Sequence, residues 1–234
     1  MNSDTAAVDG ADKPKKTIQS LVYNELRRSL MIGAFAPGDK VSLRSLAEVM
    51  GTSMMPVREA VNRLIAERAF EMLPNRSISV PPMTREKFDE ITRWRVQLET
   101  EAVRRACHNA DAAFIKRIKA INDKMIEAFE IDAREDVLSH NYGFHFAIYE
   151  AAESSVLLPM IESLWLQAGP FTYYSLPSPK RLWNAKFHRQ IIDALSAKDP
   201  DAAAAAMESD IVNTADFLKK SGHYNTSKVR RIGR

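Results

Sequence analysis

The chain has 234 residues, of which 45% are hydrophobic and 27% are charged, with 8 glycines and 11 prolines, a composition typical of a globular protein and not of a fibre or a disordered chain. The single cysteine, Cys107, excludes a disulfide within the chain, and no run approaches the roughly eighteen consecutive apolar residues of a membrane-spanning helix. Because the first residues also lack the apolar core of a signal peptide, we expect a cytoplasmic protein with no membrane partner.

Charge is distributed unevenly along the chain, although the formal net charge is only +3. Residues 13–80 carry a net charge of +5, residues 81–216 carry −5, and the tail from residue 217 holds 6 basic residues and no acidic one. A basic N-terminal segment followed by an acidic body indicates a nucleic-acid-binding module attached to a second domain. Solvated basic faces are common, so charge alone is weak evidence for this partner.

Three helices are predicted at the N-terminal end of the chain. The first covers residues 17–31, where apolar side chains recur at helical spacing. The second covers residues 42–50, with Ser42 as its N-cap and Gly51 directly after its end. The third covers residues 53–67. Two helices joined by a tight glycine turn are typical of a helix-turn-helix motif.

A hairpin is predicted directly after these helices. Residues 70–73 and 78–80 are short extended runs, and residues 74–77 between them form a turn with a basic tip. The hairpin is therefore a candidate wing beside the helix-turn-helix. The two prolines at 81–82 cannot continue a strand ladder, so we expect a domain boundary there.

Every segment beyond this boundary is predicted to be helical. The expected helices cover residues 84–108, 111–130, 136–152, 154–173, 179–197 and 200–220. The fold class is therefore mainly α, with an N-terminal winged helix-turn-helix and a C-terminal all-helical bundle of about six helices.

Four segments follow from this division of the chain. We expect a disordered N-terminal tail at 1–16, a DNA-binding domain at 17–82, a helical effector-binding and dimerisation domain at 83–220, and a basic mobile tail at 221–234.

The third predicted helix is a candidate recognition helix. Its N-terminal end presents free backbone N–H groups and a positive dipole, which suit phosphate groups and base edges in the major groove. Arg44 on the preceding helix and Arg76 on the wing flank it with positive charge. Isolated arginines are often only solvated surface, but their convergence on one module favours DNA contact. The candidate DNA-binding residues are Arg44, Ser53, Met54, Met55, Pro56, Arg58, Asn75 and Arg76.

Residues 32–80 contain a distinctive combination of residue types. The set consists of Gly33, Pro37, Gly38, Leu46, Ala47, Gly51, Ser53, Pro56, Val57, Arg58, Glu59 and Ala60. In this combination the segment resembles the winged helix-turn-helix of GntR-type bacterial transcriptional regulators. The resemblance implies DNA contacts by Arg44 and Arg58. The chain departs from the pattern where Met54 replaces a usual arginine and Ser77 a usual glycine, so the operator sequence does not follow from the family, because methionine cannot give guanine two hydrogen bonds.

A second set of residues runs through the predicted bundle. It consists of Arg95, Glu99, the stretch 141–145, Ala151, His188, Ile191, Ile192 and Leu195. With these residues the helical part resembles the FCD ligand-binding domain of the FadR-type branch of the same family. The resemblance implies a small organic acid or sugar acid as effector, held by a metal and an arginine, although some members of the branch hold no metal.

Asn141 and His145 are four residues apart, so on a helix they share one face. His188 and Asp210 lie on two later predicted helices. If these faces converge, they offer two imidazoles, a carboxylate and an amide oxygen, a set compatible with zinc, nickel or manganese. Histidines on separate helices are more often ordinary core or surface groups. The resemblance implies a metal set of one aspartate and three histidines, from which Asn141 and Asp210 depart.

Arg95 lies one turn before Glu99 on a helix whose buried stripe is expected to include Ile91, Trp94, Leu98 and Ala102. A guanidinium that faces a bundle interior needs a partner. A bound carboxylate would supply one through a two-pronged contact, which makes Arg95 a candidate effector-binding residue. The alternative is an internal ion pair between Arg95 and Glu99, with no ligand bound.

Three classes of function are compatible with these patterns. The first, which we favour, is a ligand-responsive repressor of a metabolic operon. It binds operator DNA as a homodimer, and the operator is a short palindrome. The second is a DNA-binding adaptor whose helical domain only dimerises. The third is a metalloenzyme, since two histidines and a carboxylate also occur in non-haem iron oxygenases, but no substrate motif supports it, so we predict that the chain is not an enzyme.

Overall fold

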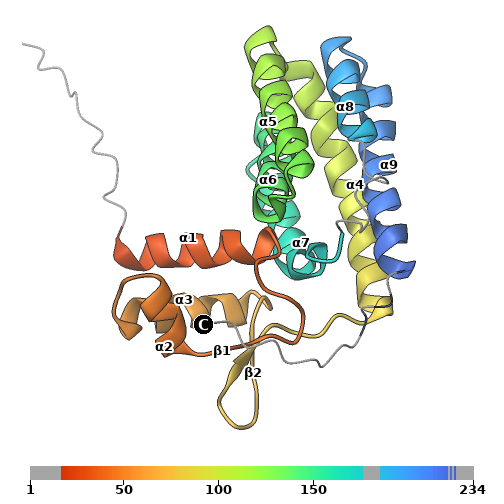
Figure 1. The fold of residues 1–234 in the computed structure, drawn as a ribbon. Coiled ribbons are helices and arrows are strands. Elements are labelled where there is room, and N and C mark those ends of the chain that lie inside the picture. Colours follow the sequence, from red (N-terminus) through yellow and green to blue (C-terminus); the bar gives the residue numbers. More distant parts are fainter. Residues whose placement is uncertain (1–16, 176–184, 221, 223, 225–234) are drawn as a thin grey trace, which may run out of the picture.

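The computed structural model describes residues 17–175 and 185–220, with residues 222 and 224 (Figure 1). Its elements are α1 (Ile18–Met31), β1 (Lys40–Val41), α2 (Leu43–Val49), α3 (Met54–Ala66), β2 (Glu71–Met72), β3 (Ile78–Ser79), α4 (Arg85–Asn109), α5 (Ala112–Glu130), α6 (Arg134–Ala151), α7 (Leu157–Thr172), α8 (Lys186–Ser196) and α9 (Pro200–Lys220). The predicted fold class is confirmed: a winged helix-turn-helix precedes a helical bundle. The tails expected at 1–16 and 221–234 lie outside the described residues, apart from residues 222 and 224.

The helix-turn-helix forms where capping residues and a glycine turn divide the N-terminal segment. The Thr17 side chain accepts a hydrogen bond from the Ser20 amide at 3.2 Å, and Ser42 accepts one from the Ser45 amide at 3.0 Å. Gly51, between α2 and α3, has a φ of 60°, a left-handed conformation that favours glycine. The core of the module is formed by buried side chains of α1 and α3, among them Leu26, Leu30, Val57, Val61 and Leu64.

Three short strands form an antiparallel sheet with the order β1-β3-β2. Strands β2 and β3 form the predicted wing hairpin, whereas β1 is a strand that the sequence pattern does not predict. In the turn of the hairpin, the Asn75 side-chain oxygen accepts a hydrogen bond from the Ser77 amide at 3.1 Å, and Arg76 has a φ of 62°. The turn projects beyond the sheet at the far end of the module (Figure 1).

Helices α4 to α9 form the bundle. Thr84, Asp111 and Asp199 cap α4, α5 and α9 by accepting hydrogen bonds from backbone amides three residues ahead, at 3.2, 2.6 and 3.0 Å. Helix α4 packs against α6, α7 and α9, while α5 packs against α6 and α8 against α9 (Figure 1). The first part of the helix expected at 179–197 lies outside the described residues, and α8 begins at Lys186. Among the described residues, no helix combines the length and apolarity that crossing a bilayer requires.

The buried face of α4 includes Ile91 and Ala102, as predicted, but it does not include Trp94. Trp94 is 51% exposed, whereas Glu99 is 0% exposed. The reason is that Arg95 and Glu99 form an ion pair, so the face that carries them turns inward without leaving a buried charge uncompensated. A pattern that ranks side chains by hydrophobicity alone therefore misplaces Trp94 and misses the buried Glu99.

Helix α1 lies between α3 and the bundle, and it packs against both α3 and α7 (Figure 1). At its C-terminal end the backbones are in close contact, because a Cβ atom on Gly169 of α7 would lie 2.6 Å from the Met31 Cα. A Cβ on Gly33, which has a φ of 73°, would lie 2.8 Å from a backbone nitrogen at the end of α7. Farther along α1, Arg27 forms an ion pair with Glu162 of α7 at 2.8 Å. The two halves of the chain are thus docked directly onto each other.

Candidate functional site

Helix α3 presents an exposed face that contains most of the predicted DNA-contacting side chains. Met54 and Met55 are 49% and 62% exposed, and Arg58 is also exposed. On α2, the exposed Arg44 forms an ion pair with Glu48 at 3.1 Å. Such a pair between two exposed side chains contributes little to stability, so it does not prevent Arg44 from reaching a phosphate group.

The remaining predicted DNA-binding residues lie at the start of α3 and at the tip of the wing. Ser53 occupies the N-cap position of α3, but within the described residues its side chain makes no capping hydrogen bond. Pro56 is buried in the first turn of α3, so it shapes the start of the helix and does not present a side chain to a ligand. Asn75 and Arg76 are exposed at the wing tip.

The C-terminal end of α3 is joined to α1 by a polar cluster. The Tyr23 hydroxyl lies 2.8 and 2.9 Å from the two Glu67 carboxylate oxygens, and Arg63 forms an ion pair with the same carboxylate at 3.0 Å. The Arg63 guanidinium also lies 3.7 Å from the centre of the Tyr23 ring. Burial, together with the hydrogen bond to Glu67, raises the pKa of Tyr23 to about 12. The recognition helix is therefore held to α1 by a hydroxyl that stays protonated at neutral pH.

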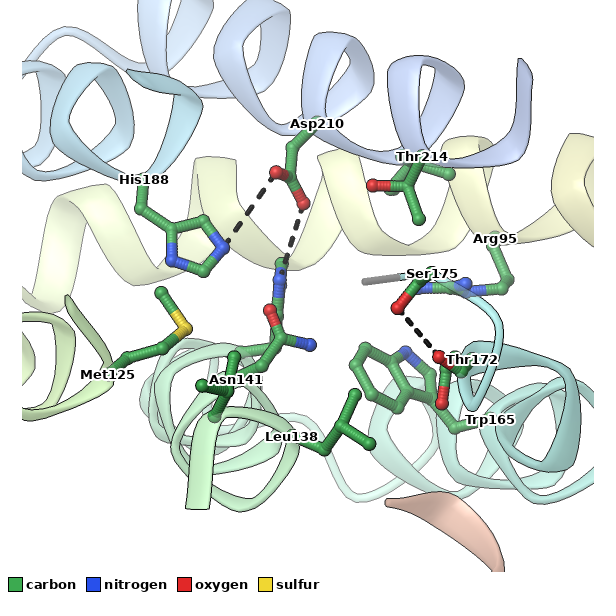
Figure 2. Close-up of a pocket in the computed structure, with 13 residues that line it drawn as sticks. Arg95, Met125, Leu138, Asn141, Trp165, Thr172, Ser175, His188, Asp210 and Thr214 are labelled. Carbon is green, nitrogen blue, oxygen red and sulfur yellow. Dashed lines mark hydrogen bonds and ion pairs between the residues drawn. The ribbon is translucent and has the colours of Figure 1, made fainter. Parts of the chain in front are cut away.

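The bundle contains a cavity of about 70 Å³ that is lined by side chains from all six of its helices and from the segment after α7 (Figure 2). Four of its lining residues are the predicted metal ligands Asn141, His145, His188 and Asp210. The predicted effector-binding residue Arg95 lines the same cavity. The structure therefore brings together side chains that are separated by as many as 115 positions in the sequence.

Two histidines and an aspartate converge in this cavity. His145 Nε2 lies 3.3 Å from one Asp210 carboxylate oxygen, and His188 Nε2 lies 3.8 Å from the other. Ligand atoms of the three residues all lie within 4.8 Å of one another. Neighbouring ligand atoms around a zinc ion are separated by about 3 to 3.6 Å. The three side chains therefore have the right chemistry and lie close enough to hold a divalent cation after their ligand atoms move together by about 1 Å. Asn141 lies one turn before His145 on α6 and lines the cavity beside them (Figure 2).

The protonation of these groups at neutral pH also suits a metal. Burial lowers the pKa of His188 to about 4, so its imidazole is neutral. Burial by itself raises the pKa of Asp210, but His188, His145 and Arg95 outweigh it and hold the pKa below its usual value. A neutral imidazole and an ionised carboxylate are the forms that bind metal ions, since a protonated ligand must first lose its proton.

The two histidine rings are oriented by hydrogen-bonding groups on their far sides. His188 Nδ1 lies 3.3 Å from the Asn122 side-chain oxygen, and His145 Nδ1 lies 3.1 Å from the Tyr149 hydroxyl. The Phe144 ring stacks on His188 with a centroid separation of 4.1 Å. Neither Asn122 nor Tyr149 is predicted from the sequence. The four-residue spacing from His145 is a signal that points to Tyr149, whereas only the folded bundle brings Asn122 near His188.

Arg95 makes the internal pair that the sequence offered as an alternative to a ligand. Its Nε and Nη2 atoms lie 2.7 and 3.3 Å from the two Glu99 carboxylate oxygens. The Trp165 indole N–H donates to the same carboxylate at 2.9 Å, and the Arg95 guanidinium lies 4.6 Å from the centre of the Trp165 ring. Because a guanidinium carries five N–H donors, this pair still leaves donors on the face that lines the cavity.

Comparisons with known proteins give the family of the chain. Residues 18–80 match the family described as bacterial regulatory proteins, gntR family, and residues 90–213 match the FCD domain. The chain is 34% identical over 197 residues to the HTH-type transcriptional regulator McbR of Escherichia coli (strain K12), which covers 82% of this chain and 89% of McbR. It is 27% identical over 213 residues to the "Probable D-xylose utilization operon transcriptional repressor" of Paenarthrobacter nicotinovorans, covering 90% and 92% of the two chains.

Solved structures show the same architecture. The structure of E. coli McbR/YncC superposes with a TM-score of 0.82 at 29% identity, covering 88% of this chain and 98% of that one. A GntR regulator from Rhodococcus sp. RHA1 superposes with a TM-score of 0.69 at 22% identity, covering 87% and 98%, which shows the fold alone. The expected family is confirmed: the chain belongs to the GntR family of DNA-binding transcriptional regulators, carries an FCD ligand-binding domain, and is not an enzyme.

Proposed function

We propose that this regulator binds a palindromic operator as a homodimer, represses a metabolic operon in the cytoplasm, and responds to a small organic or sugar acid held beside a divalent metal. The observation that carries the proposal is the convergence of His145, His188 and Asp210 in a cavity that Arg95 also lines. A cation at the three ligands and a guanidinium nearby together form a site that is complementary to a carboxylate.

The proposed metal ligands are His145, His188 and Asp210, with the Asn141 amide oxygen as a fourth. Zinc, nickel and manganese are the candidate ions, because imidazole and carboxylate ligands suit all three. An amide oxygen is neutral and donates more weakly than a carboxylate, so Asn141 lowers the affinity of the set for hard cations. When bound, the ion supplies positive charge that attracts the carboxylate of the effector.

The proposed effector site lies between this metal set and Arg95. Thr172 and Ser175, at the end of α7 and just after it, and Thr214 of α9 bring hydroxyl groups to the same cavity (Figure 2). The Thr172 and Ser175 hydroxyls donate to backbone carbonyls at 2.6 Å, which leaves their oxygens as acceptors for the hydroxyls of a sugar acid or a hydroxy acid. The volume of about 70 Å³ favours a small acid over a ligand with a long chain.

The proposed operator contacts come from the exposed face of α3 and from the wing. In this proposal Arg58, Met54 and Met55, which are exposed, contact base edges in the major groove. The exposed Arg44 and Arg76 contact backbone phosphate or the minor groove. A homodimer presents two such modules, and its two-fold symmetry matches a palindrome. The repressor named for D-xylose utilisation supports repression of a metabolic operon as the output.

Helix α7 is the proposed link between the effector and the DNA. Trp165 and Thr172 of α7 line the cavity, while Gly169 between them contacts α1. Helix α1 is in turn joined to the recognition helix through Tyr23 and Glu67. An effector that shifts the C-terminal turns of α7 therefore changes the position of α3 relative to the bundle, which alters the fit of the two modules to the operator.

A thermal-denaturation screen tests the proposed ligand class. Metal-stripped protein is heated with a panel of small organic and sugar acids, each with and without zinc, nickel or manganese. A ligand at a hundredfold its dissociation constant stabilises the fold by about 2.7 kcal/mol, which raises the melting temperature by several degrees. We expect a shift that needs both metal and acid, is lost in His188→Ala, and persists in His108→Ala, a matched change at an exposed histidine.

Other outcomes of this screen point elsewhere. A shift with acid alone that is lost in Arg95→Ala would contradict the metal and retain the carboxylate site. The absence of any shift across the panel would contradict the effector class and favour the adaptor function, in which the helical domain only dimerises.

A further inference from the structure

We infer that Tyr149 is a positioning residue: held by Glu99, it keeps the proton of His145 on Nδ1 and so leaves Nε2 free to bind a metal ion. The inference rests on the proposed metal site and adds to it the group that determines which histidine nitrogen is available. Neither Glu99 nor Tyr149 belongs to the proposed ligand set.

Glu99 accepts hydrogen bonds from side chains of three different helices. Arg95 of α4 donates two, Trp165 of α7 donates one at 2.9 Å, and Tyr149 of α6 donates through its hydroxyl. Arginine and tryptophan side chains can only donate, so both Glu99 oxygens act as acceptors. Because Glu99 is 0% exposed, water does not compete for these oxygens, and the carboxylate is a fixed acceptor at the centre of the bundle.

The position of the Tyr149 proton follows from this acceptor. A tyrosine hydroxyl has one proton, and three acceptors lie near it: the Glu99 carboxylate, His145 Nδ1 and the Met207 sulfur. The proton goes to Glu99, because a charged carboxylate accepts more strongly than a neutral imidazole nitrogen or a thioether sulfur. The Tyr149 oxygen therefore faces His145 Nδ1, 3.1 Å away, as an acceptor, and Nδ1 must carry a proton to donate to it.

The tautomer of His145 determines what its Nε2 atom presents to Asp210. With its proton on Nδ1, the neutral ring presents a lone pair on Nε2 to an Asp210 oxygen 3.3 Å away. These two groups are both hydrogen-bond acceptors, and without a proton between them neither is satisfied. A metal cation satisfies both, because it accepts an electron pair from each. The second histidine has the same arrangement, because the Asn122 oxygen near His188 Nδ1 can only accept. The Tyr149 hydroxyl thus orients the His145 ring and the Asn122 amide oxygen orients the His188 ring, so that both Nε2 atoms face Asp210.

The tautomer of His145 is measured directly by ¹⁵N NMR of the metal-free full-length protein at pH 8, with the signal assigned by its loss in His145→Gln. We expect a protonated Nδ1 and an unprotonated Nε2. In Tyr149→Phe the acceptor beside Nδ1 is gone, so we expect the proton to move to Nε2, where Asp210 accepts it. Tyr142→Phe is the matched control, because it removes a hydroxyl from the same helix and leaves Tyr149 in place.

The second readout is the affinity for Zn²⁺ alone, measured by competition with a chelator. Loss of a group that orients a ligand typically lowers metal affinity by about 10- to 100-fold, and we expect this for Tyr149→Phe but not for Tyr142→Phe. A wild-type His145 with its proton on Nε2 would overturn the inference, and this result needs no variant to fold. If the wild type shows the expected tautomer but binds no zinc, the metal proposal fails while the role of Tyr149 in setting the tautomer stands.

Discussion

Gly169 of α7 and Met31 of α1 are in backbone contact, so close that a Cβ atom on the glycine would lie 2.6 Å from the Met31 Cα. The contact joins the helix that walls the ligand cavity to the first helix of the DNA-binding module. A side chain at this position cannot be accommodated by rotating a flexible neighbour, because the atoms it would meet are backbone atoms.

Substitution of Gly169 by alanine is therefore expected to separate α1 from α7. Overpacking at a buried contact costs about 1 to 3 kcal/mol, which we expect as a loss in the free energy of unfolding in urea. Gly143→Ala on α6 is the matched control, since its Cβ would meet only an Ile121 side-chain carbon at 3.8 Å. Alanine favours a helix over glycine, so this control should keep or raise stability. Equal stability of the two variants would contradict the tight contact.

Arg58 is expected to make a base contact through the major groove. Arg58→Ala should weaken specific operator binding by about 1 to 3 kcal/mol at a fixed salt concentration, the contribution of one good base contact. Arg93→Ala, which removes an exposed arginine from α4 in the bundle, is the matched control and should leave the affinity unchanged. Fluorescence anisotropy with labelled operator measures both. Equal affinities would remove Arg58 from the set of base-contacting residues.

Met54 is expected to read thymine methyl groups, because it is exposed at the start of α3 where arginine is usual in the family. Replacing a contacted thymine by uracil removes one methyl group, worth about 0.8 kcal/mol or roughly fourfold in affinity. The loss should disappear in Met54→Ala and persist in Met160→Ala, whose methionine on α7 is equally exposed at 49%. An operator in which no thymine-to-uracil change affects the wild-type protein would contradict this contact.

The stability of the metal-free protein is expected to fall as the pH is lowered from 7 to 5. Burial lowers the pKa of His188 to about 4, so between that value and its usual 6.5 the unfolded chain binds a proton that the folded chain does not. The free energy of unfolding then decreases by about 2 kcal/mol over this interval. Urea unfolding of His188→Gln should lack this part of the pH dependence, whereas His108→Gln should retain it. If the free energy of unfolding changes equally with pH in the wild type and in His188→Gln, His188 is not the group responsible.

Most of the fold follows from local sequence signals. Helices α1, α4, α5 and α9 begin near the positions that capping residues and apolar periodicity indicate, and Gly51 marks the turn of the helix-turn-helix. Strand β1 does not follow, because two residues are too few to show an alternating pattern and their partner β3 is distant in the sequence. The exposed Trp94 does not follow either, since the inward turn of α4 depends on an ion pair and on packing against α9.

The candidate site is predictable to a smaller extent. Spacing places Asn141 and His145 on one face, but it is the resemblance to a family that selects His188 and Asp210 from later helices. The roles of Asn122 and Tyr149 depend on hydrogen bonds across the folded bundle, where no local pattern exists. The family motif includes Pro56, but this side chain is buried in the first turn of α3, which a motif alone does not reveal.

We propose that occupancy of the bundle cavity controls the affinity of the recognition helix for DNA. The most direct measurement is the affinity for an operator fragment, selected by the protein from random DNA, with and without the metal and acid that raise its melting temperature. Allosteric coupling of about 1 to 3 kcal/mol predicts a change of about 5- to 150-fold, lost in Arg95→Ala. An affinity that stays the same when the cavity is demonstrably filled would contradict the claim and identify the bundle as a dimerisation domain alone.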